Sequence, residues 1–246
     1  MAVSVTNERG SRAMTAEQLR IIEARWAEIQ ALSLKSGSHE KADHEFCVME
    51  AVAYVAGEPW ADHPACASAV LTEFAIAWND GLPSDEDRDR LLKPLIPRLV
   101  GTRASAKIEE RRAYMALDWL IRVHTRKWLD LVPALSEHAK ALRDLPEVMD
   151  LAGARAAGER VRAAQVASAA ARDAARGAAW DAARDAAGDA AADAAWAAAR
   201  GAARDAAWDA ARDAARDVIK PTVAWLQTSV LALFERMIAV SEEAKP

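Results

Sequence analysis

Four residues between positions 44 and 66 have the types and spacing of a metal site. His44 and Cys47 are separated by two residues, and His63 and Cys66 repeat that spacing, which gives the pattern H-x2-C-x15-H-x2-C. Histidine nitrogens and cysteine sulfurs are the usual ligands of tetrahedral zinc. A cysteine beside a histidine could instead act as a nucleophile, which requires a lowered thiol pKa. The spacing matches none of the common zinc-finger signatures, so we predict no bound metal.

Further polar side chains extend this group. On a helix at residues 45–56, the polar residues would fall within an arc of about 120°. The candidate ligand-binding residues are His44, Cys47, Glu50, Tyr54, Asp62, His63 and Cys66. Glu50 and Glu58 could form an acid–base pair, but nothing in the sequence places them around a substrate. A polar helix face beside a loop, with Cys66 as a small core residue, explains the same pattern more simply. We therefore predict no catalytic residue.

A second candidate is a basic cluster in and just before a long helix predicted at 104–131. The candidate phosphate contacts are Arg103, Lys107, Arg111 and Arg122. Arginine and lysine side chains commonly contact phosphate oxygens. Three acidic residues, Glu109, Glu110 and Asp118, dilute the cluster, so a solvated helix face is the competing interpretation. His124 lies on the apolar face of the same helix and is expected to be a core histidine.

Helical periodicity recurs over the first 145 residues, and no alternating apolar–polar strand of useful length occurs. After a flexible tail at 1–14, helices are predicted at about 15–33, 45–56, 65–79, from Ser84 onward, 104–131 and 133–143. Ser84 is a favourable N-cap, and Pro94 and Pro97 break the chain after that helix. The pattern predicts an all-α fold, with a helical globular domain at 15–150.

Residues 170–217 consist of twelve four-residue repeats such as AARD and AAWD, built only from Ala, Asp, Arg, Trp and Gly. Because Ala and Arg favour helix, we predict a repeat helix at 151–217, either straight or bent at a glycine. Each repeat rotates the Ala stripe by about 40°, so one straight partner could not cover all three tryptophans. Expansion of a short DNA repeat would produce the same pattern without a selected role.

The C-terminal segment, 218–246, is predicted to form a packing or oligomerisation helix that begins just after Pro221. Its apolar stripe includes Val223, Leu226, Val230, Phe234 and Met237. Such a stripe must be covered, and a second subunit could supply the missing surface. We therefore predict a homo-oligomer, with packing on the globular domain as the rival arrangement.

Composition and charge exclude several classes of function. The 246 residues carry a net charge of −5 and two cysteines, which disfavours nucleic-acid binding and a disulfide framework. No secretory signal or membrane-spanning stretch is visible in the sequence. We expect a cytoplasmic protein without a membrane partner or a cofactor.

Three segments are specific enough to suggest a relationship: CVMEAVAYVAGEPWADHPAC (47–66), LLKPLIPRLVGTR (91–103) and RAYMALDWLIRVHTRKWLDL (112–131). Over residues 15–145 the chain resembles a family of uncharacterised helical proteins from bacteria and their phages. The resemblance implies a recurring helical domain, often followed by variable Ala-rich sequence. It assigns no functional residue.

These patterns favour a non-enzymatic interaction or scaffold protein that assembles through its helices, as a homo-oligomer or with another protein. The alternative is a small-ligand-binding or metal-dependent helical protein. Its site would lie around His44, Cys47, Glu50, His63 and Cys66.

Overall fold

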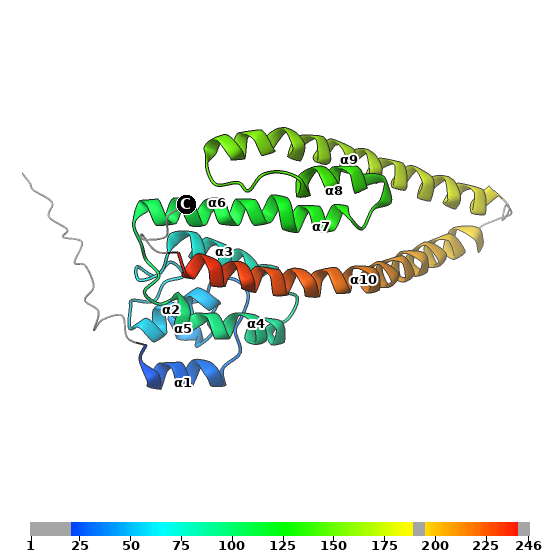
Figure 1. Ribbon diagram of the computed structural model, residues 1–246. Coiled ribbons are helices and arrows are strands. Elements are labelled where there is room, and N and C mark those ends of the chain that lie inside the picture. The colour runs from blue at the N-terminus through cyan, green and yellow to red at the C-terminus, as the bar shows by residue number, and fades with distance from the viewer. Residues whose placement is uncertain (1–20, 189–194, 241–246) are drawn as a thin grey trace, which may run out of the picture. The chain divides into compact units, whose positions relative to one another are not determined.

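The computed structural model describes residues 21–188 and 195–240, and side chains over 21–174 and 217–240. The fold is all-α, as predicted (Figure 1). The predicted tail at 1–14 lies outside the described residues. No described helix combines the length and apolar character needed to cross a bilayer.

The chain divides into two compact units, and the division falls within helix α6 (Ala106–Asp118). Unit 1 comprises the chain up to Glu109 together with the residues from Ile238 onward, and unit 2 comprises Glu110–Met237. This division differs from the predicted globular domain at 15–150. The division lies inside the helix predicted at 104–131, so the helical periodicity of that segment gives no sign of a boundary between two units.

Unit 1 contains five α-helices and two short 3₁₀ turns among its described residues. The helices are α1 (Glu23–Ala31), α2 (Val48–Ala56), α3 (Ala69–Gly81), α4 (Asp85–Leu92) and α5 (Ile96–Leu99), and the turns are η1 (Lys41–Asp43) and η2 (Lys93–Leu95). Ser68 and Ser84 accept hydrogen bonds from Leu71 N and Asp87 N, so they cap α3 and α4. The predicted cap at Ser84 is confirmed.

Helix α2 lies at the centre of unit 1. Eight of its nine residues are buried, as expected for a helix that is apolar on nearly every side. It ends at Gly57, whose φ of 77° is a left-handed conformation that glycine adopts without strain. The backbone N–H of Lys35 donates to Phe46 O at 2.9 Å, which ties the loop after α1 to the start of α2.

Unit 2 begins with a nearly continuous helical run. After α6 comes η3 (Trp119–Thr125), a π-helical segment, and then α7 (Arg126–Leu129). The 3₁₀ turn η4 (Pro133–Leu135) and α8 (Ser136–Arg143) follow. The single helix predicted at 104–131 is therefore interrupted by seven residues with a wider helical repeat.

Helix α9 (Leu151–Gly188) packs on this run through small side chains. Ala157 and Ala164 are buried in a core that also contains Ile121 and Leu142. The partly buried residues of α9 in the same core are Ala154, Val161, Ala167 and Ala171. Together, the buried and partly buried residues of α9 follow one another at intervals of three or four, which places all six on one helix face. Small side chains on this face allow close approach of the neighbouring helix.

The repeat is carried by two helices, α9 and α10 (Ala195–Ile238). Residues 189–194 and the side chains of Trp180, Trp196 and Trp208 lie outside the described part. A bend of the repeat between α9 and α10 would also lie outside it. Helix α10 continues through Pro221, so the predicted start of a separate helix after Pro221 is wrong. Asp217 and Pro221 are exposed, so solvent can bond to the carbonyl that proline leaves without a donor.

The C-terminal apolar stripe is covered within the chain. Leu226, Val230, Phe234 and Met237 are buried, and Val223 is half-buried. Side chains of unit 2 fix this part of α10: Arg112 Nε donates to Met237 O at 2.9 Å, and Trp119 Nε1 donates to Ser229 Oγ at 2.8 Å. The stripe is therefore covered at these positions by its own chain, and the prediction of a homo-oligomer does not depend on it.

Candidate functional site

The polar face predicted on α2 is a helix cap. Cys47 is the N-cap residue, and its Sγ accepts a weak hydrogen bond from Glu50 N at 3.4 Å. The Glu50 carboxylate accepts in return from Cys47 N at 2.8 Å. This reciprocal pair is a capping box in which cysteine takes the place normally held by serine or threonine. Both side chains therefore satisfy backbone donors at the start of α2.

The second partner of Glu50 is His39, which sequence reasoning missed. The His39 backbone N–H donates to Glu50 Oε1 at 2.7 Å, and the His39 ring Nδ1 donates to Oε2 at 3.0 Å. Only 1% of the Glu50 side chain is exposed, so these donors replace the water that the carboxylate loses. A carboxylate so enclosed has no free oxygen for a substrate.

The remaining members of the predicted group are distributed over separate contacts. His44 is exposed, with a left-handed φ of 52°. Tyr54 OH donates to Glu28 at 2.6 Å, and the Arg25 guanidinium lies 4.8 Å from the centre of the Tyr54 ring. Both contacts anchor α2 to α1 at the surface of unit 1.

His63 sits between two carboxylates at the surface. Its Nδ1 lies 2.7 Å from Asp62 Oδ1, and its Nε2 lies 3.0 Å from Glu73 Oε1. These hydrogen bonds, first to Asp62 and then to Glu73, raise the pKa of the imidazole. The arrangement ties the 57–68 loop to α3, and Cys66 takes no part in these two hydrogen bonds.

Both cysteine thiols are protonated at neutral pH. Burial raises the pKa of the Cys47 thiol to about 12 and that of the Cys66 thiol to about 11, where the Glu58 carboxylate adds to the effect. A nucleophilic cysteine needs the opposite shift. Among the described residues, no group of three or more His, Cys, Asp or Glu side chains is placed to hold a metal ion.

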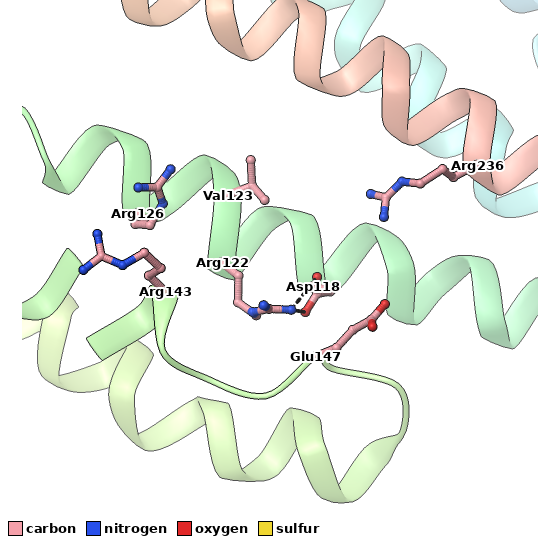
Figure 2. Close-up of a pocket in the computed structure, with 7 residues that line it drawn as sticks. All are labelled: Asp118, Arg122, Val123, Arg126, Arg143, Glu147 and Arg236. Carbon is pink, nitrogen blue, oxygen red and sulfur yellow. Dashed lines mark hydrogen bonds and ion pairs between the residues drawn. The ribbon is translucent and has the colours of Figure 1, made fainter. Parts of the chain in front are cut away.

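The structure contains a different candidate site in unit 2, an open groove of about 400 Å³ (Figure 2). Charged residues dominate its lining, and the one apolar side chain is that of Val123. The charged residues are Arg122, Arg126, Arg143, Arg236, Asp118 and Glu147. They come from the α6–η3–α7 run, from α8, from the loop before α9, and from α10. We call this site the arginine groove.

The arginine groove has an excess of positive charge. Four arginines face two carboxylates, which leaves a surplus of two positive charges along the lining. Arg126 and Arg143 also pair with Asp130 at 2.9 Å and with Asp144 at 3.5 Å outside the lining. Such partly exposed pairs contribute about 0–1 kcal/mol, so they are easily exchanged for another anion.

Asp118 organises the inner part of the groove. Its Oδ1 accepts from Val148 N at 2.9 Å and from Arg122 Nη1 at 3.1 Å. Figure 2 shows that this ion pair is the one interaction among the seven lining side chains. Arg236 extends from α10 toward the helix that carries Asp118 and Arg122 (Figure 2). Its charge is therefore available to the groove.

Arg122 has an unsatisfied donor. Its Nε atom is buried and has no hydrogen-bond partner among the described residues. Leaving a buried donor unpaired costs about 1–3 kcal/mol, and such atoms in native proteins call for an explanation such as a bound water or ion. Arg122 also lies in the π-helical segment η3, and π turns within helices are frequent at functional sites.

The predicted phosphate contacts coincide with the groove at one residue. Arg122 lines it, whereas Arg103 precedes α6, and Lys107 and Arg111 lie on α6. Sequence reasoning missed Arg143 and Arg236 because nothing local relates α8 to the end of α10. His124 is half-buried, and its Nε2 accepts from Trp128 Nε1 at 3.2 Å, so it is a partly covered histidine with a local partner.

Comparison of the chain with protein-family models, with curated proteins and with solved structures finds no match. The resemblance of residues 15–145 to a bacterial and phage family therefore stays a prediction.

Proposed function

We propose that this protein is a non-enzymatic helical scaffold that joins copies of itself through its Ala-rich repeat. One observation carries the proposal: the repeat forms long helices on both sides of residues 189–194, within α9 and α10, and its sequence is mostly Ala with Arg and Asp.

The composition of the repeat suits association between identical chains. Its Ala side chains leave room for a second helix to approach closely, and its Arg and Asp residues alternate along the chain. Opposite charges on one surface can pair with the same surface of a second copy related by a twofold axis. A second copy is therefore the partner that this surface fits best.

The contacts in unit 1 support a role without catalysis. Cys47 and Glu50 cap α2, and both thiols are held in the protonated form. The alternative, ligand or metal binding around His44, Cys47, Glu50, His63 and Cys66, receives less support because these side chains belong to separate contacts. A cytoplasmic setting and membership of the bacterial and phage family are further parts of the proposal.

Light scattering on the full chain over a wide concentration range tests self-association. We expect a defined oligomer that dissociates when Trp180, Trp196 and Trp208 are all replaced by Ala, because these are the large apolar groups of the repeat. Trp225→Ala is the matched control, since this aromatic residue lies outside the repeat and contacts Lys127 in its own chain. A full chain that stays monomeric at every concentration would overturn the proposal.

A further inference from the structure

We propose that the arginine groove binds a small phosphate ester that also carries hydroxyl groups. This inference goes beyond the scaffold role, because the groove is built from described residues of unit 2 outside the repeat. It concerns a ligand of this chain and requires no second copy.

The first argument is that arginine side chains from distant parts of the chain line one groove. Arg122 and Arg126 come from the α6–η3–α7 run, Arg143 comes from α8, and Arg236 comes from α10. A guanidinium presents its donors in a planar fork that matches two phosphate oxygens. Several such forks around one space are suited to a phosphoryl group, whose three terminal oxygens can accept from more than one arginine.

The second argument is the unfinished hydrogen bonding of Arg122. Its guanidinium is bonded to Asp118 through Nη1, while its buried Nε has no acceptor among the described residues. A ligand oxygen within hydrogen-bond reach of Nε–H would complete the bonding of this guanidinium. A phosphoryl oxygen is therefore the acceptor that this site lacks.

The third argument concerns the rest of the ligand. Asp118 and Glu147 lie among the arginines, and a carboxylate repels a ligand that is anionic throughout but accepts hydrogen bonds from hydroxyl groups. The lining offers Val123 as its one apolar side chain, which disfavours an aromatic or lipid group. A volume of about 400 Å³ has the size of a small-molecule site.

Isothermal titration calorimetry on the full chain in phosphate-free, low-salt buffer tests this assignment. The probes are glucose 6-phosphate, ribose 5-phosphate, inorganic phosphate and glucose. We expect at least one ester to bind, inorganic phosphate to bind more weakly, and glucose to give no signal. Arg236→Gln and Arg122→Gln should each weaken ester binding by about tenfold, since each removes a charge-assisted hydrogen bond.

Arg155→Gln is the matched control, because it removes the same charge from an exposed position of α9 outside the lining. Circular dichroism verifies that each variant keeps its helices. The proposal is overturned if neither ester binds, or if Arg155→Gln weakens binding as much as Arg236→Gln does. Equal affinity for inorganic phosphate and for the esters would overturn the role of Asp118 and Glu147 in binding hydroxyl groups.

Discussion

The polar cluster around Glu50 in unit 1 and the arginine groove in unit 2 both contain charged side chains, but Glu50 is buried whereas the charged residues of the groove are partly or fully exposed, and their hydrogen bonds differ. Around Glu50 the donors come from residues 38–47, close together in the sequence, and they occupy both carboxylate oxygens. In the groove the lining residues extend from position 118 to position 236, and Arg122 keeps an unpaired donor. The cluster around Glu50 stabilises the start of α2, whereas the groove leaves Arg122 Nε without a partner among the described residues.

The largest effect expected from this contrast is on thiol reactivity in unit 1. Burial raises the pKa of Cys47 from 9.0 to about 12, so its thiolate fraction near neutral pH is about a thousandfold lower than that of an exposed cysteine. Mass spectrometry should show slow labelling of native Cys47 by iodoacetamide and fast labelling after unfolding in urea. Cys66, with a pKa raised to about 11, should lie between them. Rapid labelling of native Cys47 would show that the cluster around Glu50 is open.

Removing the Glu50 carboxylate should strongly destabilise the protein. Glu50→Ala leaves the backbone N–H groups of His39 and Cys47 without their acceptor and the His39 ring without its partner. We expect a loss of about 3 kcal/mol in the free energy of unfolding, measured with urea. Glu73→Ala, at a side chain that is 72% exposed, should change it by less than about 0.5 kcal/mol. Similar losses in both variants would contradict the enclosed role of Glu50.

Asp118 in the groove accepts hydrogen bonds from Val148 N and from Arg122, and removing it should have an intermediate effect. Asp118→Ala removes the acceptor for the buried Val148 N–H and for Arg122, so we expect a loss of about 2 kcal/mol. Asp118→Asn keeps an acceptor for Val148 and should cost about half as much. If the two variants are equally stable in urea, the bond to Val148 contributes nothing and the charge alone matters.

The smallest effect should appear in the pH dependence of stability. Burial lowers the pKa of His124, so the unfolded chain takes up a proton first, at about pH 6.5. The contribution of His124 is therefore present above that pH and is lost as the pH falls. Urea midpoints at about pH 7.5 and pH 5 should differ less in His124→Gln than in the parent protein.

His63 in unit 1 should affect the pH dependence of stability in the opposite direction to His124. Hydrogen bonds to Asp62 and then to Glu73 raise its pKa, so its contribution is fully present below about pH 6.5 and is lost as the pH rises through the raised value. His63→Gln should therefore remove some of the stability measured in mildly acidic solution. These two predictions are wrong if His124→Gln and His63→Gln change the pH dependence of the free energy of unfolding in the same direction.

The all-α fold was predictable because its signals are local. Apolar periodicity, the serine cap of α4 and the proline break after it each act within a few residues. The capping box of α2 was also readable from the spacing of Cys47 and Glu50, but cysteine is an unusual member of that motif. A rule based on serine and threonine does not find it, and metal-ligand spacing offered the more familiar interpretation.

The candidate site was predicted only at Arg122. Arg126 lies four residues further on the same helical run, whereas Arg143 and Arg236 reach the groove through tertiary packing that no periodicity within one helix specifies. The same limit explains the C-terminal stripe. Its residues were recognised as needing cover, but whether the cover came from the same chain depended on contacts more than a hundred residues apart, such as Arg112 with Met237.

The π-helical segment η3 has a wider repeat than α6 and α7, and one aromatic contact depends on it. Trp119 and His124 are five residues apart, and their rings lie 5.3 Å from centre to centre. In an α-helix, residues five apart point about 140° away from each other, so this contact depends on the wider repeat. Deleting one residue between them would make them four apart, and an α-helix would then place them on the same face. The wider turn therefore accommodates one extra residue while both rings stay on one side of the helical run.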